Sequence, residues 1–151
     1  MPDLPAMLIV PVDGSDGANA AAGFAGELAD RLQVPLNLLF AFPVSPFDVF
    51  GVPDDASSQY FDPETFEQLR KEASTVAFDG ARKALKGCGA EVSEVFLAGD
   101  AATVILQYAA EHPGAMIIMG RRGMSRVKEV LLGSVSQRVL HHATCPVLVV
   151  Q

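Results

Sequence analysis

Short apolar runs alternate with segments of helical periodicity along almost the whole of this sequence. Strands that are apolar at nearly every position are buried on both faces, which is typical of parallel sheets. Right-handed helical crossovers between consecutive strands would then give an α/β fold, a doubly wound parallel sheet of five strands with helices on both faces. The five apolar runs are Met7–Val12, Pro35–Phe42, Glu91–Ala98, Ala115–Met119 and Pro146–Val150.

Each interval between two runs carries a helix signal. The four predicted helices are Gly17–Leu32, one from Asp62-Pro63 to Gly87, Asp100–Glu111, and one from Gly133-Ser134 to the residues before Cys145. Asp62 and Asp100 are good N-cap residues, and Pro63 suits a first helical position. The periodicity places Phe24 on the apolar face of the first helix and Val76 on that of the second.

The length of 151 residues suits one compact domain, residues 1–151, and we find no internal repeat. The exception to the regular pattern is Pro43–Phe61, a loop insertion rich in Pro, Asp and Ser that still holds four aromatic side chains. Long loops in compact domains are often functional. Two interpretations therefore stay open for this segment: a mobile surface excursion, or a flap or partner surface.

The charge balance restricts the class of partner. The chain has 18 acidic and 11 basic side chains and a formal net charge of −7. Generic binders of nucleic acids or anionic membranes need a positive field, so this balance argues against both. The charge is uneven, because residues 1–100 carry −10 and residues 101–151 carry +3, with four cations between Arg121 and Lys128. This cluster raises the question of a small anionic ligand.

The sequence predicts a cytoplasmic protein without direct membrane insertion. The amino terminus lacks the basic region of a signal peptide, since Asp3 precedes every Lys and Arg. The longest uncharged run, Leu32–Phe47, contains three prolines and is too short to span a bilayer comfortably. Cys88 and Cys145 lie far apart with no metal-ligand spacing. We expect two reduced thiols, with a disulfide or redox pair as the alternative.

The strongest binding signal is Gly120-x-x-Gly123 followed, after nine residues, by Gly133-Ser134. Ligands of open parallel sheets bind beyond the carboxyl ends of the strands. Glycines let backbone N–H groups approach phosphate oxygens, and a helix N-terminus adds unpaired donors and a positive dipole end. Ser134 and Ser136 can add hydroxyl donors, and Arg122 or Arg121 a positive charge. The pattern therefore predicts an anion-binding site.

Asp13, at the tip of the first predicted strand, has two interpretations. Its carboxylate can accept hydrogen bonds from a ribose hydroxyl or an adenine amino group, or it can form an Asx-turn or N-cap before the next helix. Catalytic templates are missing from the sequence, which contains neither G-x-x-x-x-G-K-[ST] nor G-x-S-x-G. Its three histidines have no metal-ligand spacing. We therefore predict no catalytic residue and no metal site in the protein itself.

These motifs resemble the universal stress protein family, and specifically its ATP-binding branch. The resemblance runs from Met7 to Val150 and includes LIVPVDGS at Leu8–Ser15, Ala98-Gly99-Asp100, and the block MGRRGMSRVKEVLLGSVSQRVLHHATCPVLVV. It implies a Rossmann-like sheet in the order 3-2-1-4-5, ATP with Mg²⁺ across the carboxyl end of the sheet, and a homodimer through the last strands. Carried over residue by residue, the implied contacts are Pro11, Val12, Asp13 and Ala41 around adenine and ribose, Met119, Gly120, Arg122 and Gly123 at ribose and phosphates, and Gly133, Ser134, Val135 and Ser136 at the triphosphate.

The sequence also supports pairing through the last strand. Pro146–Val150 is a short apolar strand, and an exposed apolar edge invites pairing with a second copy. Val147 and Val149 would lie on one face and Leu148 and Val150 on the other. We expect a homodimer, and pairs of dimers can form a tetramer.

The leading functional hypothesis is an ATP-binding regulatory protein in stress adaptation, with no catalytic apparatus of its own. Its nucleotide state would set the shape or assembly of the dimer and act on a protein partner such as a membrane transporter. One alternative is a slow ATPase or self-phosphorylating protein that uses Ser134 or Ser136 as acceptor. The other is an interaction module whose partner surface is Pro43–Phe61.

Overall fold

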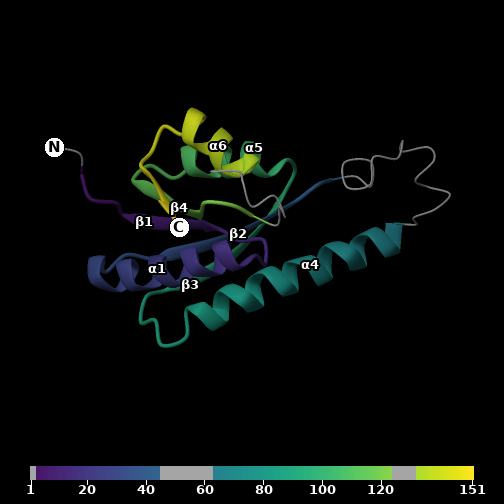
Figure 1. Ribbon diagram of the computed structural model, residues 1–151, viewed down its shortest axis with the longest axis horizontal. Coiled ribbons are helices and arrows are strands. Elements are labelled where there is room, and N and C mark those ends of the chain that lie inside the picture. The colour runs from purple at the N-terminus through teal and green to yellow at the C-terminus, as the bar shows by residue number, and fades with distance from the viewer. Residues whose placement is uncertain (1–2, 45–62, 124–131) are drawn as a thin grey trace.

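The computed structural model describes residues 3–44, 63–123 and 132–151 (Figure 1). Most of the predicted loop insertion, and the cations Arg126 and Lys128, lie outside these residues. The elements in chain order are β1 (Met7–Pro11), α1 (Asp16–Leu32), β2 (Leu36–Phe42), α4 (Pro63–Ala84), β3 (Val92–Ala98), α5 (Ala101–Ala110), β4 (Ala115–Gly120), α6 (Ser134–His142) and β5 (Val147–Val150).

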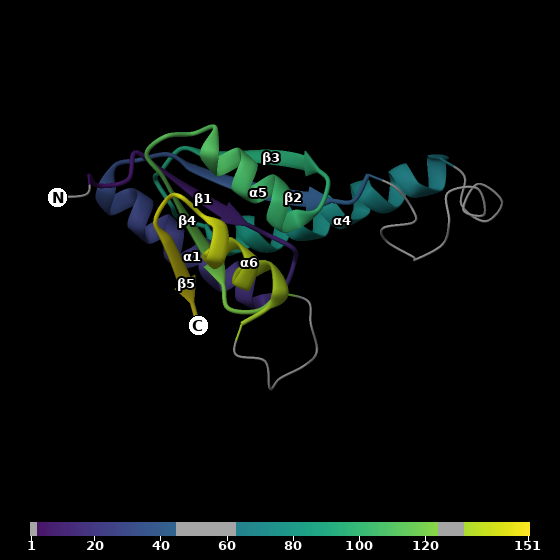
Figure 2. The same cartoon turned by 90° about the horizontal axis from the view of Figure 1, so that it is seen from above.

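The strands form a five-stranded sheet in the order β3-β2-β1-β4-β5, and all neighbouring strands are parallel. Figure 2 shows them side by side, from β3 at one edge to β5 at the other. In Figure 1, α5 and α6 lie above the sheet, and α1 and α4 lie below it. The predicted doubly wound sheet and its strand order are confirmed.

Two apolar clusters, one on each face, hold the layers together. Leu8, Val10 and Leu38 point toward α1 and α4, whereas Ile9, Leu39 and Ile117 point toward α5 and α6. All six side chains are at most 1% exposed. The central strands β1, β2 and β4 thus carry apolar side chains on both faces, which explains their uninterrupted apolar sequence.

The buried faces of two helices differ from the prediction. Phe24 is 49% exposed, and α1 instead buries small residues, chiefly alanines. Small side chains let α1 lie close against β1 and β4, so its core face is poor in large residues. Val76 of α4 is 61% exposed, while Ala77, Phe78 and Ala81 are buried. At 3.6 residues per turn, Val76 lies on the side of α4 away from these three buried residues. The beginning of α4 extends past the sheet (Figure 1), although Phe66 there still packs on Phe42 of β2.

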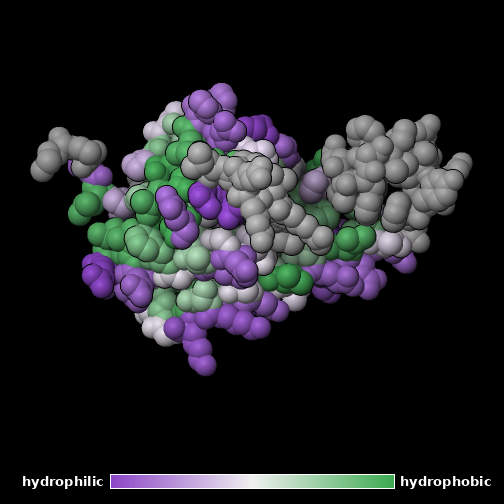
Figure 3. Space-filling model, in the orientation of Figure 1, coloured by the Kyte–Doolittle hydropathy of each residue, from purple (hydrophilic) through white to green (hydrophobic). Residues whose placement is uncertain are grey.

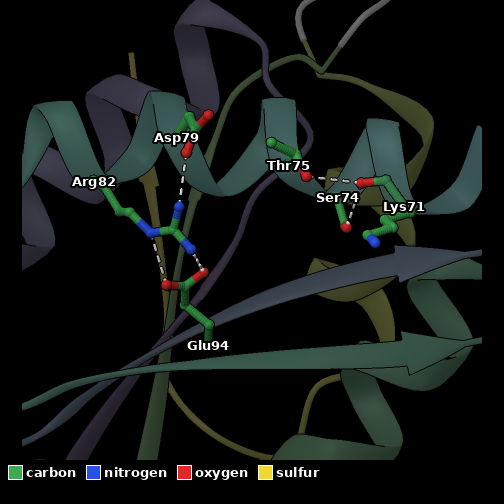
Figure 4. A network of polar contacts seen from close by, with 6 residues as sticks. All are labelled: Lys71, Ser74, Thr75, Asp79, Arg82 and Glu94. Carbon is green, nitrogen blue, oxygen red and sulfur yellow. Dashed lines mark hydrogen bonds and ion pairs between the residues drawn. The ribbon is translucent and has the colours of Figure 1, made fainter.

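Polar contacts tie α4 to the edge strand β3 (Figure 4). Arg82 donates to both carboxylate oxygens of Glu94 on β3, at 2.8 and 2.5 Å, and to Asp79 one turn earlier at 2.7 Å. Near the middle of α4, the hydroxyls of Ser74 and Thr75 both donate to the carbonyl of Lys71 at 2.9 Å. The Arg82–Glu94 pair therefore connects a partly exposed helix to a partly exposed strand.

The start of α1 packs directly on the end of β4. A Cβ atom on Gly120 would lie 2.7 Å from both the carbonyl carbon and oxygen of Gly17, and a Cβ on Gly17 would lie 2.8 Å from the carbonyl oxygen of Arg122. Both distances are below any normal contact with backbone atoms. Glycine at 17 and 120 is thus required by the approach of two backbones, and Gly120 has a packing role that its sequence motif did not indicate.

We expect Gly17→Ala to destabilise the fold by about 1–3 kcal/mol, because the new methyl group meets backbone that cannot rotate away. Gly23→Ala on the same helix is the matched control, since its Cβ would lie 3.5 Å from the nearest atom, the Ala84 carbonyl oxygen. Alanine there improves helix propensity, so the control should be neutral or more stable by up to about 1 kcal/mol. Denaturant unfolding measures both, and equal stabilities would contradict the packing argument.

Candidate functional site

A pocket opens at the carboxyl ends of β1 and β4, where the strand order reverses. All twelve residues predicted from the sequence to contact the ligand line it. They are Pro11, Val12, Asp13, Ala41, Met119, Gly120, Arg122, Gly123, Gly133, Ser134, Val135 and Ser136. The structure thus brings together residues from β1, β2, β4 and α6, while their contact with a ligand stays a prediction.

Five further residues line the same pocket and were not predicted: Ser15, Ala18, Leu39, Ala101 and Ile105. Leu39 and Ile105 are almost fully buried beneath it. In the sequence they look like ordinary core residues of a strand and a helix, so no motif marks them as pocket residues. Together with Val12 and Met119 they give the pocket an apolar wall.

Asp13 connects the turn after β1 to the segment after β4. Its Oδ1 accepts a hydrogen bond from the Ser15 backbone N–H at 2.9 Å, which confirms the Asx-turn interpretation. A Cβ on Gly123 would lie 2.5 Å from the other oxygen, Oδ2. One carboxylate oxygen therefore shapes the turn, and the other lies beside Gly123 at the pocket. Ser15 caps α1 by accepting from the Ala18 N–H at 3.2 Å.

The first turn of α6 supplies backbone donors to the pocket. Its N-cap is Gly133, and its first intrahelical bond runs from the Gln137 N–H to the Gly133 carbonyl. The N–H groups of Ser134, Val135 and Ser136 precede that bond and have no acceptor within the helix. They lie at the positive end of the helix dipole. This is the arrangement that binds anions at helix N-termini.

The two serines of this turn differ in their surroundings. Ser134 is exposed, and α6 has no side-chain cap. Ser136 is only 4% exposed, and its hydroxyl donates to the Gly120 carbonyl at 2.9 Å. The hydroxyl of Ser136, predicted as a donor to phosphate, therefore already has an acceptor in the protein.

Hydrogen bonds after β4 join the pocket to the edge of the sheet. The Arg121 N–H donates to the carbonyl of Val150, the last residue of β5, at 3.0 Å. The Arg121 carbonyl accepts from the Gly133 N–H at 2.8 Å. Because the Gly120 carbonyl accepts from Ser136, the peptide between Gly120 and Arg121 is bonded to α6 on one side and to β5 on the other.

An ion pair joins α5 to α6 near the pocket. Asp100, the N-cap of α5, accepts from the backbone N–H and the hydroxyl of Thr103, and from Nη1 of Arg138 on α6 at 2.9 Å. The Thr103 hydroxyl, followed by its N–H and Arg138, lowers the pKa of Asp100 below its ordinary value. The predicted cap is confirmed, and it also restrains α6.

Neither a metal-ligand group nor a membrane-spanning helix occurs among the described residues. Within residues 3–44, 63–123 and 132–151, no three His, Cys, Asp or Glu side chains are grouped closely enough to hold a metal ion. In the same part of the chain no helix is both long and apolar enough to cross a membrane. Cys88 and Cys145 are free thiols, as expected.

Fold and site together define a doubly wound parallel α/β protein with its pocket at the topological switch point. The chain belongs to the universal stress protein family, whose model matches residues 7–151. It is 32% identical over 144 residues to universal stress protein MJ0531 of Methanocaldococcus jannaschii, covering 95% of this chain and 81% of the relative. It is 31% identical to universal stress protein YxiE of Bacillus subtilis, covering 95% and 97%.

Solved structures agree with this assignment. Universal stress protein UspA from Lactobacillus plantarum is 27% identical with a TM-score of 0.80, over 99% of this chain and 100% of the other. A universal stress protein in complex with cAMP is 22% identical with a TM-score of 0.70, over 99% of both chains. One from Archaeoglobus fulgidus in complex with dAMP is 24% identical with a TM-score of 0.61, over 100% of both. At these identities the last two show the shared fold.

Because the pKa of Asp100 is lowered on folding, its carboxylate stabilises the folded state above the unfolded-state pKa, and this contribution is lost as the pH falls through the folded-state value. We expect the unmodified protein to lose more stability between about pH 5 and about pH 2 than Asp100→Asn, which keeps a capping side chain without the charge. Denaturant unfolding across this range measures the difference. The exposed pair makes the effect small and sensitive to salt, and equal pH slopes would refute it.

Proposed function

We propose that this protein binds ATP with Mg²⁺ and acts as a nucleotide-responsive regulatory protein. The observation that supports this most is that the twelve predicted contact residues, drawn from four separate elements, line a single pocket. An apolar wall suits a flat purine ring. Backbone donors at the start of α6 suit phosphate oxygens.

Different residues of the pocket would contact the adenine, the ribose and the phosphates of ATP. Val12, Ala41 and Met119 line the apolar side and would contact adenine. Asp13 Oδ2 would accept a hydrogen bond from ribose, since Oδ1 already accepts from Ser15. The N–H groups of the first turn of α6, with the exposed Ser134 hydroxyl and the Arg122 side chain, would contact the phosphates.

The carboxylates that line the pocket also indicate how Mg²⁺ would be held. Asp13 is the one carboxylate among the described residues that line the pocket, and it already accepts a backbone hydrogen bond. Mg²⁺ retains several waters and is commonly held by substrate phosphates with only one or two carboxylates. The ion would therefore arrive with ATP and neutralise phosphate charge. The cAMP and dAMP complexes are below 25% identity, so the proposal rests on the pocket of this chain.

Titration calorimetry with ATP and Mg²⁺, after removal of co-purified nucleotide, tests the binding. Gly133→Val should weaken ATP binding at least about tenfold, because its branched side chain fills the space between α6 and the Arg122 backbone where phosphate would lie. A single Cβ there would lie 3.4 Å from the Arg122 Cα, so Gly133→Ala is a milder variant that should fold normally. Gly23→Ala, distant from the pocket, is the control. No ATP binding by the unmodified protein would refute the proposal.

Regulation requires that ATP prefers one conformational state or assembly. The hydrogen bonds of the Arg121 backbone could transmit ATP binding to the sheet edge, because they join the first turn of α6 to the carboxyl end of β5. We propose that ATP binding biases the position of β5 and thereby a homodimer formed through it, two of which can build a tetramer. In the cytoplasm this dimer would act on a protein partner, for which a membrane transporter is one candidate.

The β5 edge has the features of a pairing surface. The carbonyls of Pro146 and Val150 accept from β4, so by alternation Val147 and Val149 direct their backbone groups to the open edge. Their side chains pack toward α5 and α6, and those of Leu148 and Val150 toward α1 and α4, as predicted. Figure 3 shows apolar side chains gathered around this edge. Exposed apolar edges favour pairing with another strand.

Val149→Pro tests the dimer. Proline removes the N–H that faces the open edge and leaves the bonds from β4 to Pro146 and Val150 in place, so we expect a folded monomer where the unmodified protein is a dimer. Val149→Thr, which keeps the N–H and the β-branched shape, should remain dimeric. Sedimentation velocity measures the mass of each variant. A dimeric Val149→Pro protein would place the interface elsewhere.

A further inference from the structure

The two serines in the first turn of α6 are two residues apart, and their hydroxyls have different environments. Ser134 is exposed at the mouth of the pocket. Ser136 is 4% exposed and donates its hydroxyl proton to the Gly120 carbonyl at 2.9 Å. A hydroxyl has a single proton to donate. While this bond persists, Ser136 cannot also donate its hydroxyl to a phosphate oxygen.

The acceptor of this bond is the end of a core strand. Gly120 is the last residue of β4, and the backbone of Gly17 at the start of α1 lies within contact distance of it. The N–H of the same peptide, from Arg121, donates to Val150 on β5. The Gly120 carbonyl is therefore fixed from two sides, and a helix bonded to it takes up a defined position relative to the sheet.

Two hydrogen bonds fix the first turn of α6 to this point. They are the Ser136 hydroxyl to Gly120 and the Gly133 N–H to the Arg121 carbonyl. Ser134 and Val135 lie between these two bonds and line the pocket, and their N–H groups have no acceptor within the helix. The direction of these N–H groups depends on both bonds, because α6 has no side-chain cap of its own.

We propose that Ser136 is a positioning residue, which aims the backbone donors of α6 at the ligand phosphates through its bond to Gly120, while Ser134 is the serine whose hydroxyl contacts the ligand. This assignment rests on the proposed ATP-binding function. The sequence motif gives the two serines the same role, whereas in this assignment Ser136 holds the helix and Ser134 contacts the anion.

Ser136→Ala and its matched control Ser134→Ala test the assignment by amide hydrogen exchange of the ligand-free proteins. Loss of the Ser136 hydroxyl should accelerate exchange of the Gly133 and Arg121 amides, because it loosens the turn and the peptide beside it. Ser134→Ala should leave exchange at both amides unchanged. This measurement needs no ligand and reports how readily the first turn of α6 and the neighbouring peptide open.

Calorimetry with ATP and with adenosine, on folded protein at a temperature well below unfolding, supplies the second measurement. Both alanine variants should weaken ATP binding about three- to tenfold and leave adenosine binding unchanged, since adenosine has no phosphate. Faster exchange in Ser136→Ala with ATP affinity unchanged would make Ser136 merely structural and overturn the proposal. Weaker ATP binding with exchange unchanged would make it a direct ligand and overturn it as well.

Ser136→Thr keeps a hydroxyl and should restore both the slow exchange of the Gly133 amide and the ATP affinity. If Ser136→Ala does not fold, this variant carries the test, and loss of ATP affinity with slow exchange retained would overturn the assignment. Failure of the unmodified protein to bind ATP would refute the proposed function and this assignment together. This result can be told apart from the others because it is obtained with the unmodified protein alone.

Discussion

The arrangement of the pocket depends on one backbone contact, the approach of α1 to the end of β4. Gly17 and Gly120 are close enough that a Cβ on either would collide with the backbone opposite. Because α1 starts directly after the turn of Asp13, this contact places that turn beside the residues that follow β4. Gly123 can then lie against the Asp13 carboxylate. Backbone packing thus brings the two halves of the pocket together.

The same contact leaves the end of β4 as a junction between three parts of the molecule. Arg121 donates to β5 and accepts from Gly133 of α6, and Gly120 accepts from Ser136. A change at the first turn of α6 therefore has a short covalent and hydrogen-bonded path to the edge strand. This path passes through backbone groups, so the side chains at 121 and 150 can vary without breaking it. The nucleotide response proposed above could use such a junction, because a ligand need only favour one position of the helix.

Much of the fold could be predicted because the central strands are apolar on both faces and the helices carry clear caps. Asp100 caps α5 as expected. The sequence misled where tertiary packing decides: Phe24 has the periodicity of a core residue but is half exposed, because the close approach of α1 to the sheet selects alanine instead. Leu39 and Ile105 were missed as pocket residues because the same apolar residue types occur in the core and in the wall of the pocket.

The motif Gly120-x-x-Gly123 and Gly133-Ser134 located the pocket, yet its residues have unlike roles. Gly120 serves the packing of α1, and Gly123 makes room for Asp13. Gly133 has an extended backbone that any residue adopts, with φ of −67°, and no atom closer than 3.4 Å to its Cβ position. Glycine at 133 is therefore not required by close packing, although glycine is favoured at N-cap positions. Of the three glycines, Gly133 is the one whose surroundings leave room for the proposed approach of phosphate to the helix start.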